Sequence, residues 1–246
     1  QHRVNDLSSL SNNYIISLYE DSKKRLWVGT YQGGVNKMDI KTGKCKHYLQ
    51  GDIQQGSDIR IIFEDSRGEI FIGTNRGGLY KYIENIDEFE FINSLGRLDV
   101  RDISEGSSGY FWMATYGNGI IRYEPNTGET IFYNSSNIEK FKTDVIFSIL
   151  ALPNGDILAG TQLNPKEKRI LNFTEIDGLS NNTVSSIVMD DEKSIWLGTF
   201  KGISNYNSLT NTIFNLNTYT NIQQSKFNIG SGLITQSGVV YFSCAI

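Results

Sequence analysis

The chain has 246 residues, of which 39% are hydrophobic and 20% are charged, and its formal net charge is −4. This composition is typical of a folded globular protein and excludes a disordered chain. The lack of a dense lysine or arginine cluster argues against nucleic acid and anionic membranes as partners, and no apolar run approaches the roughly 18 residues of a membrane helix.

A strand-like motif of the type Leu-Trp-Val-Gly-Thr recurs along the whole chain. Its copies are residues 26–30, 70–74, 111–115, 157–161 and 195–199, with a degenerate copy at 240–244. Each full repeat adds an earlier strand, a glycine turn and two later strands, which in the first repeat are residues 16–21, 35–38 and 45–48. Repeats of about 40–45 residues with four strands are typical of propeller blades. We therefore predict an all-β β-propeller of about six four-stranded repeats, with an incomplete last blade and an open or partial ring.

The predicted single domain covers residues 1–246, with repeats at approximately 5–50, 51–94, 95–136, 137–176, 177–217 and 218–246. The fourth repeat lacks the glycine turn after Thr161 and reads Gln162 to Arg169 instead, so we expect its third strand to be missing or short. The chain stops at Ile246, just past the second strand of the sixth repeat, and residues 1–4 are too short to supply the two missing strands. We expect an open arc, or a ring that another segment or chain completes.

The repeats resemble the two-component regulator propeller repeat. The resemblance is carried by Ser9–Asn13, Ile16–Asp21 and Leu26–Thr30 with Gly33-Gly34, and again by Asp177–Asn182 followed by Ile195–Thr199. Residues 227–232 and 238–242 resemble the last blade before that family's three-tyrosine domain. In that family, such repeats form the periplasmic, glycan-binding sensor region of hybrid two-component system histidine kinases of Bacteroides-type bacteria. The resemblance implies a periplasmic or extracytoplasmic fragment of a longer protein, whose kinase lies outside this chain.

The residues that usually carry catalysis or bind metals are scarce. The two histidines, His2 and His47, lie at the terminus and in an outer strand, no Cys/His cluster has zinc spacing, and no phosphate-binding loop occurs. We therefore expect no catalytic residue, no metal and no cofactor. Cys45 and Cys244 lie in strand-like runs and are expected to be buried free thiols, although their spacing leaves the redox compartment open.

Two series of repeated side chains have a structural interpretation beside a functional one. Trp27, Trp112 and Trp196 share one repeat position with Phe71, Leu158 and Tyr241, so this position either stacks on sugars or packs between blades. The leucine favours packing. Aspartates precede the motif in several repeats, and we expect them to bond their own backbone in turns: Asp21, Asp65 and Asp191.

Candidate ligand-binding residues follow from strand direction. Because the strands of a meander alternate in direction, the loop leading into each repeat and the loop after its second strand share one face. The second set of loops offers Tyr31, Gln32, Asn75, Arg76, Tyr116, Asn118, Phe200 and Lys201. The first set offers Asn12, Asn13, Asp58, Asn181 and Asn182, where the asparagines can equally be turn residues. Aromatic, amide and charged side chains on a rigid scaffold suit an oligosaccharide.

Three functions remain open from the sequence. The first is a non-catalytic sensor module that recognises a glycan fragment, and the second is a propeller scaffold that binds protein partners. The third is a carbohydrate-active lyase or hydrolase, which needs converging carboxylates or a Tyr/His pair. The expected partners are an oligosaccharide and either a second copy or a missing propeller segment, without nucleic acid and without a membrane segment in this chain.

Overall fold

The computed structural model describes residues 1–52, 56–139, 141, 143–161, 173–216, 226–235 and 237–244. In these residues the regular structure is almost entirely β-strand, and the helical segments are the short 3-10 turns η2 (Asn93–Leu95) and η3 (Glu175–Asp177). The strands form six antiparallel sheets, which we number 1 to 6 in chain order.

Sheets 1, 2, 3 and 5 are four-stranded meanders in which each strand pairs with its neighbour in sequence. Sheet 1 contains β1 (Ile15–Glu20), β2 (Leu26–Thr30), β3 (Val35–Met38) and β4 (Cys45–Tyr48). Sheet 2 contains β5 (Ile59–Glu64), β6 (Ile70–Thr74), β7 (Gly78–Ile83) and β8 (Glu88–Phe91). Sheet 3 contains β9 (Val100–Glu105), β10 (Phe111–Thr115), β11 (Ile120–Tyr123) and β12 (Thr130–Tyr133). Sheet 5 contains β15 (Val184–Met189), β16 (Ile195–Thr199), β17 (Gly202–Asn207) and β18 (Thr212–Asn215).

Sheets 4 and 6 are two-stranded among the described residues. Sheet 4 pairs β13 (Ile146–Ala151) with β14 (Ile157–Thr161), and sheet 6 pairs β19 (Phe227–Ile234) with β20 (Val240–Cys244). The all-β propeller prediction is confirmed, but the predicted count of about six four-stranded repeats is wrong, because four sheets are four-stranded. A third strand follows a turn with positive φ, as at Gly34 (φ 75°) and Gly78 (φ 90°), and the sequence after β14 has no such glycine. The predicted loss or shortening of that third strand falls on residues 162–172, which lie outside the described residues.

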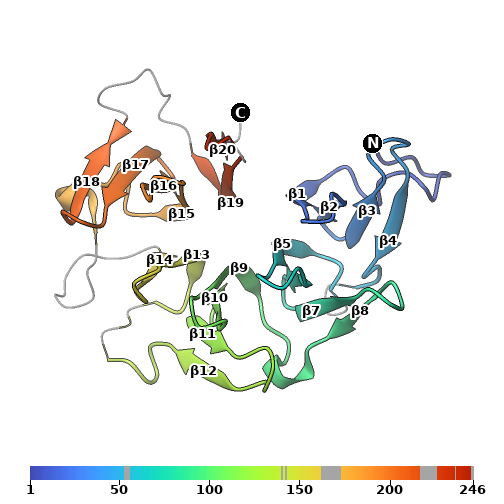
Figure 1. Ribbon diagram of the computed structural model, residues 1–246, viewed down its shortest axis with the longest axis horizontal. Coiled ribbons are helices and arrows are strands. Elements are labelled where there is room, and N and C mark those ends of the chain that lie inside the picture. The colour runs from blue at the N-terminus through green and yellow to red at the C-terminus, as the bar shows by residue number, and fades with distance from the viewer. Residues whose placement is uncertain are drawn as a thin grey trace.

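The sheets follow one another around a common centre, with the first strand of each sheet innermost (Figure 1). Each inner strand contacts the next one along the chain: β1 with β5, β5 with β9, β9 with β13, β13 with β15, and β15 with β19. Among the described strands, no comparable contact joins sheet 6 to sheet 1. Sheets 1 and 6 are therefore the two ends of an incompletely closed ring.

The repeated tryptophan position packs between neighbouring sheets, as predicted, wherever a following sheet covers it. Trp27 is fully buried, with its ring centroid 5.0 Å from that of Tyr82 in sheet 2. Phe71 is likewise buried, 4.9 Å from Phe111 in sheet 3. Tyr241 in sheet 6 occupies the same position and is 56% exposed. The packing interpretation therefore holds for Trp27 and Phe71. Trp112 and Leu158 are half-buried and pack against core clusters, Trp196 is half-buried, and Tyr241 in the end sheet is exposed.

The aspartates before the motif close the turns between the first two strands. Asp21 accepts hydrogen bonds from the backbone N–H groups of Lys23 and Arg25, and its Oδ2 accepts one from Trp27 Nε1 at 2.8 Å. Asp65 holds its own turn in the same way. In the fifth repeat the residue is Asp190 and not the predicted Asp191, because Asp190 occupies the register position that reaches Trp196 Nε1 at 2.7 Å.

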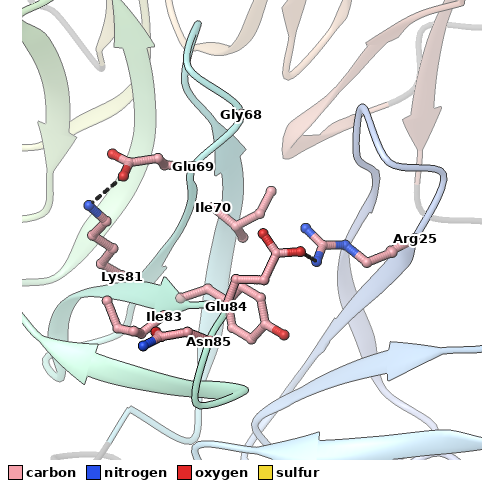
Figure 2. Close-up of a pocket in the computed structure, with 9 residues that line it drawn as sticks. Arg25, Gly68, Glu69, Ile70, Lys81, Ile83, Glu84 and Asn85 are labelled. Carbon is pink, nitrogen blue, oxygen red and sulfur yellow. Dashed lines mark hydrogen bonds and ion pairs between the residues drawn. The ribbon is translucent and has the colours of Figure 1, made fainter.

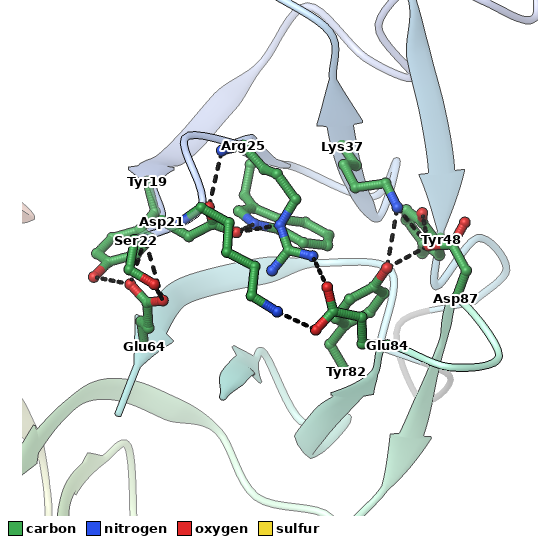
Figure 3. Close-up of polar contacts among 12 residues, drawn as sticks. Tyr19, Asp21, Ser22, Arg25, Lys37, Tyr48, Glu64, Tyr82, Glu84 and Asp87 are labelled. Carbon is green, nitrogen blue, oxygen red and sulfur yellow. Dashed lines mark hydrogen bonds and ion pairs between the residues drawn. The ribbon is translucent and has the colours of Figure 1, made fainter. Parts of the chain in front are cut away.

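Polar contacts join sheets 1 and 2 at the end of the sheets where these turns lie (Figure 3). Glu64 of β5 accepts hydrogen bonds from the backbone N–H and the hydroxyl of Ser22, and from the Tyr19 hydroxyl. Farther out, the Asp87 carboxylate accepts hydrogen bonds from four side chains: Lys37, Lys46, Tyr48 and Tyr82. The carboxylates of Glu64 and Asp87 thus connect strands that are far apart in sequence, and they fix the two sheets relative to each other.

Two further findings concern the whole described chain. Both cysteines are free thiols, and Cys45 is buried as predicted, whereas Cys244 is exposed because no following sheet covers β20. Among the described residues, no helix has the length and apolar character required to span a bilayer.

Candidate functional site

The loops named from the sequence do lie together at one end of the sheets. The residue that follows the threonine of each motif donates its backbone N–H to the carbonyl oxygen of the residue just before the inner strand. Asn75 donates to Asp58 in this way (2.9 Å), and Tyr116 donates to Asp99 (3.0 Å). Tyr31 bonds Tyr14 in sheet 1 by the same pattern. The repeat therefore brings the two sets of loops to the same face, and we call this end of the sheets the loop end.

A charged cluster occupies the loop end of sheets 2 and 3. Asp58 and Arg60 in sheet 2 form an ion pair of 3.3 Å, and Asp99 and Arg101 in sheet 3 form one of 2.7 Å. Asn75 Nδ2 donates to Asp58 Oδ2 at 2.9 Å. These five residues are called the Asp-x-Arg cluster below, after the repeated Asp58-Ile59-Arg60 and Asp99-Val100-Arg101 sequences.

A β-bulge positions each arginine of the cluster. In the pairing of β5 with β6 the register shifts between Ile59 and Ile61, so Arg60 has no partner residue opposite it. The same shift in sheet 3 leaves Arg101 in the bulge. Bulges turn a side chain away from the regular alternation of a strand and are common beside functional sites. The bulge thus lets a strand with buried flanking residues, such as Ile59 (0% exposed), carry an arginine at the loop end.

The cluster is buried and its charges compensate one another. Asp58 is fully buried and Asp99 is 6% exposed, while the Arg60 and Arg101 side chains are 20% and 15% exposed. Burial lowers the pKa of Arg60, and the neighbouring Arg101 guanidinium lowers it further, whereas Asp58 and Asp99 act in the opposite direction. Two guanidinium groups are thus held close together by two carboxylates.

The cluster and the adjoining Ser57 also hold buried polar atoms that have no hydrogen-bond partner among the described residues. They are Ser57 Oγ, Asp58 Oδ1, Arg60 Nε, Asp99 Oδ1 and Arg101 Nε. An unsatisfied buried polar group costs about 1–3 kcal/mol. Such atoms are rare in native proteins, so five of them in one place call for an explanation, such as a bound group that pairs with them. The donors and acceptors occur side by side, so a group that both donates and accepts complements them.

Exposed aromatic rings flank the cluster. Tyr116 is 49% exposed, and the Arg101 guanidinium carbon lies 4.9 Å from its ring centroid. Tyr31 is 41% exposed and interacts electrostatically with Arg60; its ring centroid is 5.9 Å from that of Tyr14. The structure therefore brings three of the sequence candidates, Tyr31, Asn75 and Tyr116, to the same cluster.

The other candidates of that set lie elsewhere in the loops. Phe200 stacks on Phe147 of sheet 4 at 6.4 Å, beneath the ammonium group of Lys226, at the loop end of sheets 4 and 5. Gln32, Arg76 and Lys201 are exposed. Asn118 donates its backbone N–H to Thr115 Oγ1 at 3.1 Å. The structure does not bring these residues to the cluster.

The asparagines of the leading loops act as turn residues. Asn12 Oδ1 accepts from the Tyr14 backbone N–H, and Asn181 Oδ1 accepts from that of Thr183 in the equivalent loop of sheet 5. Asn13 and Asn182 likewise accept backbone N–H groups, from His2 and Glu175. Asp58 alone of this set belongs to the Asp-x-Arg cluster.

Sequence reasoning missed Arg60, Asp99 and Arg101. A signal was available, since Asp-x-Arg occurs at the same position of two adjacent repeats. The corresponding positions in sheets 1, 4 and 5 carry no such charged pair. They read Tyr14-Ile15-Ile16, Val145-Ile146-Phe147 and Thr183-Val184-Ser185. A charged pair that recurs in two adjacent repeats and departs from the rest is a better marker of a site than a variable loop.

The cluster lacks the usual catalytic partners. His47 bonds the Ser9 carbonyl oxygen from the outer strand β4, and His2 bonds the Leu10 carbonyl oxygen. Neither histidine contacts the Asp-x-Arg cluster through a hydrogen bond of the described residues. In the described part of the chain, no group of three or more histidine, cysteine or acidic residues is placed to hold a metal ion.

A separate pocket of about 260 Å³ lies between sheets 1 and 2 at the end opposite the loop end (Figure 2). Its charged lining residues pair with each other, Lys81 with Glu69 at 2.7 Å and Arg25 with Glu84 at 3.0 Å. The Arg25–Glu84 pair joins the turns of the two sheets, whereas the Lys81–Glu69 pair lies within sheet 2. The pocket thus has the character of a salt-bridged junction, and its charges are already compensated.

Two segments of the chain match a known family of repeats. The two component regulator propeller family matches residues 9–32 and 178–201. These segments are two-component regulator propeller repeats. Each contains the leading loop, the inner strand and the motif strand of its sheet, so the regulator propeller repeats coincide with the parts of sheets 1 and 5 that run to the loop end. No curated protein sequence matches the chain.

Solved structures with the same fold include two extracellular domains of hybrid two-component systems from B. thetaiotaomicron. One is 26% identical over 95% of this chain, with a TM-score of 0.76, and the other is 23% identical over 98%, with a TM-score of 0.71. The chain spans 33% and 34% of those proteins. Virginiamycin B lyase from Staphylococcus aureus shares the fold alone, at 13% identity and a TM-score of 0.63 over 96% of this chain and 87% of its own.

Proposed function

We propose that the chain is a non-catalytic ligand-recognition module of an extracytoplasmic, periplasmic sensor in a two-component signalling protein, and that it binds a glycan fragment. Its regulator propeller repeats and its likeness to the extracellular domain of a hybrid two-component system support the sensor role. The observation that carries the ligand proposal is the Asp-x-Arg cluster with its unsatisfied donors and acceptors beside the exposed tyrosines.

A sugar matches both halves of this arrangement. Its hydroxyl groups donate and accept hydrogen bonds, which suits the mixed set of buried polar atoms. The C–H face of its ring is apolar, which suits the exposed rings of Tyr31 and Tyr116. Binding sites for small molecules commonly combine aromatic surface with a few convergent polar groups in this way.

Thermal stabilisation by oligosaccharides tests the proposal. A ligand at 100 times its dissociation constant stabilises the folded state by about 2.7 kcal/mol, which corresponds to a rise of about 5–10 °C in Tm for a domain of this size. We expect one class of host or plant oligosaccharide to produce this rise, and Tyr116→Ala to abolish it. Tyr241→Ala, which removes an exposed tyrosine from sheet 6, should leave the rise unchanged. A flat response of the folded chain to every oligosaccharide would refute the proposal.

A second candidate function, protein association, is favoured by the exposed apolar faces of the end sheets. Leu18 of β1 is 58% exposed, although the same repeat position is buried in the four following sheets, at Ile62, Ile103, Ile149 and Ile187. Tyr241 presents the complementary repeat position at the other end. Faces that pack together at each internal junction are thus both uncovered, and large exposed apolar patches mark interaction surfaces.

Sedimentation at several concentrations tests the association of one chain's sheet 1 with a second copy's sheet 6. Such a head-to-tail contact predicts that the weight-average mass rises with concentration, and that Leu18→Asp keeps the chain monomeric. Phe214→Asp, on the outer strand β18 and 59% exposed, is the matched control and should associate normally. A wild-type chain that is monomeric at every concentration would exclude this contact.

A further inference from the structure

The ligand class can be narrowed from the charges of the Asp-x-Arg cluster. We infer that the site takes an uncharged sugar and that Asp58, Arg60, Asp99 and Arg101 bind its hydroxyl groups, rather than a carboxylate or a sulfate. This inference rests on the proposed function and names the ligand of the same site.

The charges of the Asp-x-Arg cluster balance one another. Each guanidinium already has its own carboxylate, Asp58 for Arg60 and Asp99 for Arg101, so the positive and negative charges of the cluster cancel. An anionic sugar bound there would add an uncompensated charge to a buried site, and burial of an unpaired charge is strongly unfavourable. A neutral ligand leaves the balance intact.

The unsatisfied atoms of the cluster include both donors and acceptors. Arg60 Nε and Arg101 Nε require acceptors, whereas Asp58 Oδ1 and Asp99 Oδ1 require donors. A carboxylate or sulfate group offers acceptors only, so if it occupied this place it would leave both aspartate oxygens unpaired. A hydroxyl group offers a donor and two acceptor sites, so adjacent hydroxyls of one sugar can satisfy the donors and the acceptors together.

The charged groups of the cluster differ in how far they are exposed at the surface. The two guanidinium groups are partly exposed, while Asp58 is fully buried and Asp99 is 6% exposed. A ligand therefore meets the arginines and Tyr116 first, and reaches the carboxylate oxygens when the side chains reorient. One ion pair belongs to sheet 2 and the other to the adjacent sheet 3, so one ligand that binds both pairs would bridge the two sheets.

Neutral and anionic sugars are distinguished by whether one substitution raises or lowers the dissociation constant. Asp99→Asn removes the charge of an acceptor, and hydrogen bonds to charged groups are the stronger ones. For a neutral sugar, calorimetric titration should show a dissociation constant raised about tenfold or more, which equals about 1.4 kcal/mol. For an anionic sugar the same change removes a repulsive charge, so the dissociation constant should fall. Asp191 is an exposed turn residue far from the loop end. Asp191→Asn makes the same change in charge and should leave the dissociation constants for both sugar classes unchanged.

A measurement on the unaltered chain keeps the test valid if Asp99→Asn fails to fold. Affinity for a neutral ligand is nearly independent of salt, whereas affinity for an anion falls as salt screens the arginines. Neutral oligosaccharides that bind with salt-independent affinity, and more weakly to Asp99→Asn, would support the inference. Uronic-acid or sulfated oligosaccharides that bind in a salt-dependent way, and more tightly to Asp99→Asn, would overturn it and leave the glycan proposal standing. If no oligosaccharide of either class binds the folded chain, the inference and the proposed function both fail.

Discussion

Trp27→Ala is expected to lower the free energy of unfolding by about 3–5 kcal/mol, the usual cost of truncating a buried tryptophan. Trp27 is fully buried, its ring lies 5.0 Å from Tyr82 and 5.7 Å from Phe89, and its Nε1 donates to Asp21 at 2.8 Å. Alanine would open a cavity at the junction of sheets 1 and 2 and leave Asp21 without this donor. Urea unfolding followed by tryptophan-independent circular dichroism measures the loss.

Tyr241→Ala is the matched control, because Tyr241 occupies the same repeat position in sheet 6. Its side chain is 56% exposed, so truncation should cost less than about 1 kcal/mol. The contrast tests the incomplete ring directly. If Tyr241→Ala were as destabilising as Trp27→Ala, sheet 6 would have to be covered by another sheet in solution.

The fold was predictable because its signal is local and repeated. The motif strands begin and end where the sequence predicted, for example Leu26–Thr30 and Ile195–Thr199, since a nearly continuous apolar run can only be a strand buried on both faces. The positive-φ glycines that follow them, such as Gly34 and Gly78, fixed the turns to the third strands. The count of complete blades was not predictable to the same degree, because it depends on the fourth repeat, where this glycine turn is absent.

The site was predictable only in its location. Strand direction places Tyr31, Asn75 and Tyr116 at one end of the sheets, because alternation of direction follows from meander topology alone. Strand direction does not predict that Arg60 and Arg101 also lie at that end, because β-bulges bring them there. A bulge depends on backbone pairing with a neighbouring strand, and the alternation of a single strand does not encode it.

The two arginines of the Asp-x-Arg cluster therefore lie one position inside the inner strands β5 and β9 rather than at the loop tips. Gln32 and Arg76 have left-handed backbones (φ 55° and 59°) and remain exposed at the tips, whereas each cluster arginine is the second residue of its inner strand. Placement on the strands fixes the backbone at each arginine, so that ligand binding would have to order side chains alone, which limits the loss of entropy. It also connects the site directly to the contacts between sheets 2 and 3.

Asp87→Asn is expected to lower the free energy of unfolding by about 2–3 kcal/mol at neutral pH. The carboxylate accepts hydrogen bonds from two lysines and two buried tyrosines, and removal of one partner of such a network leaves the others unpaired. The figure is below the sum of four bonds because the Asp87 side chain is 38% exposed, so solvent screens the lysine pairs. Asparagine also tolerates the left-handed backbone of this position (φ 54°), so the substitution isolates the charge.

The pH dependence of that loss provides an independent check. Burial alone would raise the pKa of Asp87, but the hydrogen bonds from Lys37, Lys46, Tyr82 and Tyr48 outweigh it and hold the pKa well below its usual value. Because the folded-state pKa is depressed, the stabilisation is complete above the unfolded pKa of about 3.9 and is lost as the pH falls through the folded value. The wild type should therefore lose stability below about pH 4, and its advantage over Asp87→Asn should shrink there. Glu88→Gln, at an exposed neighbour 3.8 Å from Lys46, should be nearly silent at every pH; an advantage of the wild type that stayed constant down to acidic pH would show that Asp87 does not carry the charge network.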